Sequence, residues 1–245
     1  MMVQYLSVDV LKAILFGTAG MSCYNRKNFM HEGKGAMDTG EHRDFDKEAA
    51  QWDKPERIKL ANDVANAIIR EAGQLSKVNA LDFGCGTGLL TLMLQTHVKT
   101  ITGVDSSMGM LEVLRGKIKT QGLENVYAMF VNFEKGVRVQ GAYDLIVSNM
   151  TVHHVQDTAA LFRQWYALLL PGGRVFFSDL DSEDGLFHND NTGVFHHGFD
   201  RAKLKTILHT IGYREIRDTT ASTIIKEVAG GATREFPVFL IGAKK

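Results

Sequence analysis

The sequence predicts an α/β fold in which a mostly parallel sheet is covered by helices on both faces. From residue 78 to residue 180, short runs rich in Val, Ile, Leu and Phe alternate with longer segments of helical periodicity, a pattern typical of repeated β-α-β units. A glycine-rich turn follows the first apolar run, at residues 84–88. The length of 245 residues and the apolar share of 44% suffice for one substantial core, so we expect a single domain.

The elements are expected in a regular order. Residues 46–73 carry apolar side chains at spacings near three and four, which indicates an amphipathic helix or helix pair before the first strand. Residues 171–173, Pro-Gly-Gly, are expected to end a helix, because proline cannot continue it and glycine accepts the left-handed conformation of a helix end. The expected strands are 78–83, 100–104, 126–132, 143–149 and 174–180, and the expected helices between them are 87–97, 107–121 and 158–170.

Residues 181–199 interrupt this alternation. They are rich in Gly, Asn, Asp and His and predict an irregular insertion. A helix is expected to follow at 200–211, with Asp200 as its N-cap, because an Asp side chain accepts hydrogen bonds from the unpaired N–H groups of a helix start.

The C-terminal segment predicts an antiparallel pair of strands. Apolar residues alternate over 213–225 and again over 235–243, and the turn-forming pair Gly230-Gly231 lies between these runs. Pro237 cannot donate a hydrogen bond to a neighbouring strand, so we expect the last strand to begin at or after this residue.

Composition limits the classes of function. Lys+Arg and Asp+Glu number 28 each, so no net positive charge favours a nucleic-acid or membrane-surface partner. Two cysteines, Cys23 and Cys85, are too few for a disulfide framework and favour a cytoplasmic location. The apolar stretch 8–17 is too short to span a bilayer and makes a poor signal peptide. We expect residues 1–44 to be a poorly ordered leader and the functional domain to be 45–245.

Two motifs point to a nucleoside ligand. The glycine turn Gly84-Cys85-Gly86-Thr87-Gly88 follows a strand and opens a helix, where backbone N–H groups can approach a ligand closely. Asp105 ends the second strand about 20 residues beyond the turn, where a carboxylate reaches ribose hydroxyls in nucleoside-binding α/β folds. Leu89 stands where a dinucleotide fingerprint has its third glycine, which makes a nicotinamide-dependent oxidoreductase unlikely.

These motifs carry a family resemblance. The runs Leu81-Asp82-Phe83-Gly84-Cys85-Gly86-Thr87-Gly88 and Gly103-Val104-Asp105-Ser106 resemble the first two motifs of class I S-adenosylmethionine-dependent methyltransferases. The resemblance implies a Rossmann-like three-layer sandwich with a seven-stranded, mostly parallel sheet in the order 3-2-1-4-5-7-6, whose last strand is antiparallel. It also implies that residues 45–75 form an N-terminal helical lid and that residues 181–199 form a substrate-pocket insertion.

The resemblance implies roles for individual residues toward S-adenosylmethionine. Asp82 would hold the methionine ammonium, directly or through water, while the turn glycines would make room for the methionine and the ribose. Asp105 would bind the ribose hydroxyls and Ser106 would lie against the adenine. The other residues expected in the cofactor site are Gly84, Gly86, Gly88, Cys85, Asn149, Trp52, Asn132 and Phe133.

The roles expected for Asn132, Trp52 and Cys85 differ in kind. Asn132 stands where the family often has an acidic residue, and its side-chain carbonyl can accept a hydrogen bond from the adenine amino group. Trp52 would cover the sulfonium or the substrate, or else anchor the core. Cys85 belongs to the turn, and nothing in the sequence indicates a covalent thiol mechanism.

We expect methyl transfer to a small-molecule acceptor by in-line displacement, giving S-adenosylhomocysteine. His154 and His197 are the candidates for a general base, with a structural or pocket-lining role as the alternative. No histidine spacing resembles a metal motif. Residues 148–151 lack the proline-aromatic element that relatives use to hold a flipped nucleic-acid base. A protein methyltransferase and a non-catalytic S-adenosylmethionine-binding regulator stay open as alternatives, as do a monomer and a homodimer.

Overall fold

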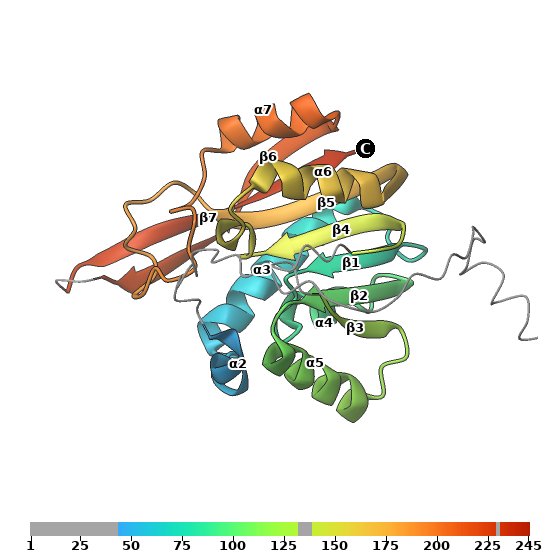
Figure 1. Ribbon diagram of the computed structural model, residues 1–245, viewed down its shortest axis with the longest axis horizontal. Coiled ribbons are helices and arrows are strands. Elements are labelled where there is room, and N and C mark those ends of the chain that lie inside the picture. The colour runs from blue at the N-terminus through green and yellow to red at the C-terminus, as the bar shows by residue number, and fades with distance from the viewer. Residues whose placement is uncertain (1–43, 132–138, 229–230) are drawn as a thin grey trace, which may run out of the picture. The chain divides into compact units, whose positions relative to one another are not determined.

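The computed structural model describes residues 44–131, 139–228 and 231–245, and its centre is one seven-stranded sheet (Figure 1). The strand order is β3-β2-β1-β4-β5-β7-β6. Strand β7 runs antiparallel to both of its neighbours, while the other pairs are parallel. This confirms the predicted sheet. The strands are β1 (Asn79–Phe83), β2 (Thr100–Asp105), β3 (Val126–Phe130), β4 (Tyr143–Asn149), β5 (Leu169–Leu180), β6 (Arg214–Glu227) and β7 (Thr233–Lys244).

Helices cover both faces of the sheet. The helices are α2 (Phe45–Glu48), α3 (Pro55–Ala72), α4 (Leu89–Leu94), α5 (Met108–Gln121), α6 (Thr158–Leu168) and α7 (Arg201–Ile211), with short 3-10 helices η1 (Ala49–Gln51) and η2 (Val152–His154). Figure 1 shows α6 and α7 together on one side of the sheet, and apolar side chains of α3 and α4 pack on the other. The predicted three-layer architecture is confirmed.

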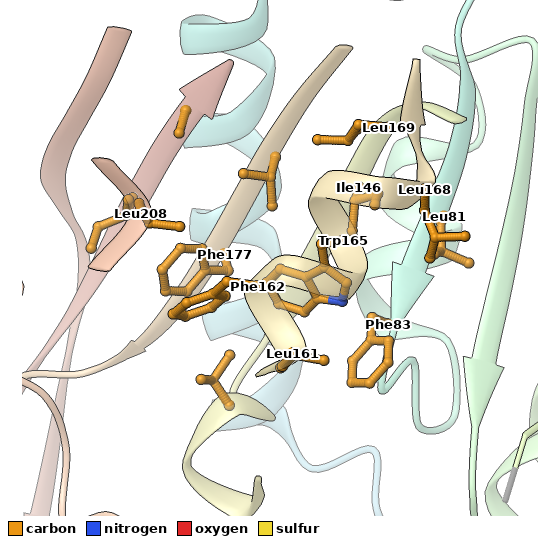
Figure 2. Close-up of a cluster of buried hydrophobic side chains, with 14 of the residues drawn as sticks. Leu81, Phe83, Ile146, Leu161, Phe162, Trp165, Leu168, Leu169, Phe177 and Leu208 are labelled. Carbon is orange, nitrogen blue, oxygen red and sulfur yellow. The ribbon is translucent and has the colours of Figure 1, made fainter. Parts of the chain in front are cut away.

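Alternation along the strands explains the two cores. Ala80 of β1 joins the cluster under α3 and α4, whereas its neighbour Leu81 joins the cluster under α6 and α7, because successive strand side chains point to opposite faces. In the second cluster the ring of Trp165 on α6 lies 5.5 Å from that of Phe162 and 5.4 Å from that of Phe83 (Figure 2).

The expected start of β5 at residue 174 is wrong. Helix α6 ends at Leu168, as the Pro-Gly-Gly signal suggests, but β5 begins immediately at Leu169 and contains residues 171–173. Leu169 pairs with Tyr143, and the next paired residues are Arg174 and Leu145. Four residues of β5 therefore stand opposite one residue of β4, which makes the Pro-Gly-Gly segment a bulge in the strand.

The last strand also begins earlier than expected, at Thr233, and contains Pro237. The carbonyl of Pro237 accepts a hydrogen bond from the backbone N–H of Asp181 at 3.0 Å. The nitrogen of Pro237 points to the same side of the strand as this carbonyl, toward the end of β5. Pairing of β5 with β7 stops at Leu180 and Val238. The missing N–H therefore faces away from β6, and the ladder between β5 and β7 ends where its bond to the Asp181 carbonyl would have formed.

The other predicted boundaries differ little, except for the helix after the glycine turn. This helix, α4, covers only Leu89–Leu94 of the expected range 87–97, because Gly88 is its left-handed N-cap. The side chain of Asp200 accepts hydrogen bonds from Ala202 and Lys203, which confirms the predicted cap. The expected leader falls almost entirely on residues 1–43, which lie outside the described residues, as do Asn132, Phe133 and Gly230.

Candidate functional site

The glycine turn joins β1 to α4, and its three glycines have positive φ angles of 69°, 54° and 84°. At two of them a side chain would collide with a neighbour. A Cβ on Gly84 would lie 2.2 Å from the Thr151 side chain, and one on Gly88 would lie 2.3 Å from that of Leu114. A Cβ on Gly86 would meet nothing closer than the indole nitrogen of Trp52, at 3.8 Å. Two glycines therefore serve packing, and the middle one lies beneath Trp52.

Asp105 lies at the carboxyl end of β2, beside this turn. Its Oδ2 accepts a hydrogen bond from the Gly86 N–H at 2.7 Å, and its Oδ1 accepts one from the Ser107 N–H at 2.8 Å. Burial raises the pKa of the Asp105 carboxyl, and the backbone hydrogen bonds oppose that rise. Since a carboxylate offers about four acceptor positions, the side chain is held in place by the protein and still has acceptor capacity for a ligand.

Asp82 lies below the turn and is 1% exposed. The hydroxyl of Thr91 in α4 donates a hydrogen bond to its Oδ2 at 2.5 Å. Burial, together with the negative charge of Asp105, raises the pKa of Asp82 to about 7 despite that hydrogen bond. The carboxyl group of Asp82 therefore does not reach the protein surface.

Cys85 contributes backbone rather than side chain to the turn. A Cβ on Gly103 would lie 2.8 Å from its sulfur, and the side chain packs with Leu111 and Leu114 of α5. Burial raises the pKa of the Cys85 thiol well above its usual range. The thiol therefore stays protonated in the core.

Residues 45–53, here termed the cap segment, are fastened to the site by two aspartates. Asp46 accepts hydrogen bonds from the Ser107 hydroxyl and from the Gly109 N–H. Asp53 accepts a hydrogen bond from the Thr87 hydroxyl at 2.5 Å and forms an ion pair with Lys117 at 2.5 Å. The cap segment is thus held at the start of α5 and at the glycine turn.

Trp52 belongs to this cap segment. The guanidinium of Arg57 lies 3.7 Å from its ring centroid, and the ring of Phe45 lies 5.9 Å away, edge-on. Together with the approach to Gly86, these contacts place the indole beside the glycine turn and not in the core. The sequence alone had left both positions open.

The end of β4 lies beside the glycine turn, since the hydroxyl of Thr151 donates a hydrogen bond to the carbonyl of Gly84 at 3.3 Å. The Asn149 Oδ1 accepts a hydrogen bond from the Ser178 hydroxyl at 2.8 Å. The following residue, Met150, has a φ of 54°, which is uncommon for a side chain other than glycine and frequent at functional sites. Ser106, at the end of β2, is exposed.

The two candidate bases lie in different surroundings. His154 is half-buried, its Nδ1 donates to the carbonyl of Gly193 at 2.7 Å, and its ring contacts that of Phe45 at 5.3 Å. His197 is 47% exposed, and its Nδ1 lies 3.7 Å from the carboxylate of Glu183. His154 therefore adjoins the cap segment, whereas the contacts of His197 stay within the insertion 181–199.

Sequence reasoning missed several polar residues that the fold brings to the site. Asp46, Asp53 and Lys117 hold the cap segment, and none of them stands in a motif that predicts this contact. Asp179 had a detectable signal, since it ends an apolar run at the carboxyl end of β5, where α/β folds bind ligands. His188 shows no spacing that sets it apart from the other histidines of the insertion.

Within residues 44–131, 139–228 and 231–245, no group of three or more His, Cys, Asp or Glu side chains is arranged to hold a metal ion. In the same part of the chain, no helix combines the length and apolar character needed to cross a bilayer.

A glycine turn after β1, a carboxylate ending β2, and the strand order with an antiparallel β7 are features of the class I S-adenosylmethionine-dependent methyltransferase fold. The chain belongs to the methyltransferase domain family, which matches residues 47–218.

Over the matched regions, curated relatives are about 30% identical to the chain. A ubiquinone biosynthesis O-methyltransferase of Bordetella pertussis is 32% identical over 150 residues, which are 59% of this chain and 62% of the relative. The corresponding Vibrio parahaemolyticus protein is 29% identical over 150 residues, 59% of this chain and 64% of the relative. The matches therefore span about three fifths of the length of these relatives.

Solved structures share the fold at lower identity. A phosphoethanolamine N-methyltransferase 2 of Haemonchus contortus, in complex with S-adenosyl-L-methionine, has a TM-score of 0.61 at 15% identity, covering 82% of this chain and 60% of that one. A SAM-dependent methyltransferase of Aquifex aeolicus has a TM-score of 0.60 at 18% identity, covering 81% and 97%.

Proposed function

We propose that the protein transfers a methyl group from S-adenosylmethionine to a small-molecule acceptor. The observation that carries this proposal is the Asp105 carboxylate, which the N–H groups of Gly86 and Ser107 hold at the carboxyl end of β2. A fixed carboxylate beside a glycine turn can accept two hydrogen bonds from a ribose diol. The family membership of the chain supports the same ligand.

The remaining residues fit this cofactor. The absence of a side chain on Gly86 exposes the turn backbone toward the indole of Trp52, and an adenosyl ligand would meet backbone N–H groups there. Ser106 is exposed beside Asp105 and would lie against the adenine. Asn149 and the cap segment would bound the methionine side. Asp82 would act on the ammonium through water, because its carboxyl group is buried.

Bound S-adenosylmethionine would supply an electrophilic methyl group. The work left to the protein is then to orient the acceptor and to exclude water. The cap segment would exclude water from above the turn. His154 would face the acceptor from the end of β4, while His197 would contact the acceptor only from the rim of the insertion.

The acceptor is proposed to be a small metabolite. The Bordetella and Vibrio relatives are named for O-methylation in ubiquinone biosynthesis, which supports a low-molecular-weight acceptor. The balance of 28 basic and 28 acidic residues gives no electrostatic reason for a nucleic-acid substrate. We further propose a cytoplasmic monomer or homodimer.

Calorimetric titration with S-adenosylmethionine, S-adenosylhomocysteine and NAD tests the proposal. Saturable binding of both adenosyl ligands is expected, with strong loss in Asp105→Ala. Asp144→Asn is the matched control, since its carboxylate accepts a backbone hydrogen bond from Asn79 at the opposite end of the sheet. Binding of NAD alone, or equal loss in both variants, would contradict the proposal.

A further inference from the structure

A buried aspartate and histidine form a pair beside the proposed cofactor site. The Nδ1 of His153 donates to the Oδ1 of Asp179 at 2.8 Å, and the His153 backbone N–H donates to the Oδ2 at 3.1 Å. The side chains are 2% and 0% exposed. Because β4 and β5 are parallel neighbours, η2 and the end of β5 meet at the edge of the sheet where α/β folds bind ligands.

Burying this pair costs free energy that burying apolar side chains would not. A buried carboxylate must be compensated by charge and hydrogen bonds, and burying a polar atom without a partner is unfavourable. The Nε2 of His153 is such an atom among the described residues. Since the carboxylate of Asp179 holds the proton on Nδ1, a neutral His153 ring carries its lone pair on that Nε2.

Two further imidazoles pack against His153. Its ring centroid lies 4.1 Å from that of His154 and 5.0 Å from that of His188. The insertion closes over them, because the N–H groups of Phe195 and His196 donate to the His153 carbonyl at 3.0 and 3.3 Å. We term the three rings of His153, His154 and His188 the histidine cluster.

A series of ring contacts connects the histidine cluster to the glycine turn. The Phe45 ring contacts His154 at 5.3 Å and Trp52 at 5.9 Å, and the Trp52 indole nitrogen lies 3.8 Å from the Cβ position of Gly86. A short series of contacts thus leads from the proposed cofactor site to His154, with Asp179 and His153 behind it.

We propose that Asp179 and His153 are positioning residues that support His154 in taking a proton from a hydroxyl acceptor. This inference rests on the proposed function. As the acceptor oxygen bonds to the methyl carbon, the carbon–sulfur bond breaks with its electron pair left on sulfur, and the hydroxyl proton passes to the His154 imidazole. The buried carboxylate of Asp179 compensates the positive charge that forms on the neighbouring imidazole.

The same arrangement favours a hydroxyl compound over other acceptors. An alcohol, phenol or enol oxygen must lose its proton during methylation, so a correctly positioned general base accelerates its reaction. A neutral amine or a thiolate attacks without that help. Asp179 accepts hydrogen bonds from the His153 ring and from the backbone N–H groups of His153 and Leu180. A positive charge that forms on a neighbouring imidazole during methylation of a hydroxyl therefore lies close to a buried carboxylate.

Nitrogen NMR of the wild-type protein tests the pair without any acceptor. Long-range proton–nitrogen spectra distinguish protonated from unprotonated ring nitrogens, and His153→Gln identifies the resonances. We expect His153 to be protonated on Nδ1 and unprotonated on Nε2, and Asp179→Asn to change this pattern because an amide can donate to Nδ1. Protonation of a neutral His153 on Nε2 would overturn the inference.

Turnover with aromatic probes of matched shape tests the acceptor class. Phenol and catechol carry hydroxyl groups, while aniline and thiophenol carry an amine and a thiol on the same ring. We expect product from the hydroxyl probes, with kcat in Asp179→Asn lower on the order of 10²-fold and Asp144→Asn unaffected. The inference would be overturned if only aniline or thiophenol were methylated, or if neither phenol nor catechol gave product. It would also be overturned if Asp179→Asn and Asp144→Asn lost the same activity.

Binding separates this inference from the proposed function. Asp179→Asn and His153→Gln should bind S-adenosylmethionine as tightly as the wild type, because the hydrogen bonds of these side chains join them to each other and to the backbone of His153 and Leu180. If the wild type binds no adenosyl ligand, the proposed function fails, whereas failure of the hydroxyl probes with intact binding rejects the acceptor class alone.

Discussion

Asp53 and Lys117 form an ion pair of 2.5 Å that links the cap segment to α5. The same two residues meet at Thr87, whose hydroxyl donates to Asp53 and whose carbonyl accepts from Lys117 at 2.8 Å. The side chains are 31% and 22% exposed, so solvent screens the pair only in part. The cap segment is therefore held against the glycine turn by a closed set of polar contacts.

Breaking this ion pair should weaken cofactor binding. Asp53→Asn and Lys117→Met are each expected to raise the Kd of S-adenosylmethionine several-fold, because the cap segment then spends less time over the turn. The double variant should lose little more than either single variant, with a coupling of about 0.5–2 kcal/mol. Calorimetry measures this, with exposed Lys119→Met on the same helix as control. Additive losses would show that the pair does not act as a unit.

Gly84 should not tolerate a side chain. Its φ of 69° and the Thr151 side chain 2.2 Å from the added Cβ predict that Gly84→Ala lowers the free energy of unfolding by about 1–3 kcal/mol. Denaturant unfolding measures the loss. Gly116→Ala is the matched control, because a Cβ there meets nothing within 4 Å, and alanine favours the helix. A neutral Gly84→Ala would mean that the turn moves freely away from Thr151.

The buried carboxyl of Asp82 should make stability depend on pH. Its pKa is raised from 3.8 to about 7 in the folded protein, so the folded state holds a proton that the unfolded state has released. Stability is then highest below pH 4 and falls as the pH rises to 7, by about 2 kcal/mol between pH 5 and 7. Above pH 7 both states are ionised and this contribution is constant.

Asp82→Asn isolates this effect, because its amide oxygen still accepts the Thr91 hydrogen bond. Urea unfolding of both proteins from pH 5 to 8 should give a difference that shifts in favour of the variant as the pH rises. A difference independent of pH would indicate that Asp82 is ionised throughout that range.

The Cys85 thiol should be unreactive in the folded protein. Burial raises its pKa and encloses it beside Gly103, so neither a thiolate nor an open path is present. In a Cys23→Ser background, we expect a disulfide reagent to modify Cys85 no faster than the protein unfolds. Addition of urea provides the positive control. Rapid modification without urea would mean that the turn opens while the rest of the fold persists.

Sequence patterns predicted the sheet well because the strands obey local rules. The run at β4 is apolar enough to be buried on both faces, and its predicted bounds match Tyr143–Asn149. The predicted bounds of a strand were wrong where pairing with a neighbouring strand sets them. Pro171-Gly172-Gly173 stops a helix by local chemistry, but whether it then forms a loop or a bulged strand depends on pairing of Leu169 with Tyr143.

The sequence by itself determined most of the strands, the glycine turn and the carboxylate at Asp105, since each follows from local residue patterns, while the family resemblance implied the strand order. Only the tertiary structure decided that Asp46 and Asp53 fasten the cap segment and that Asp179 lies behind His153. These contacts join residues 61, 34 and 26 positions apart. No local periodicity encodes such distances, because they arise when separate strands and helices pack at one edge of the sheet.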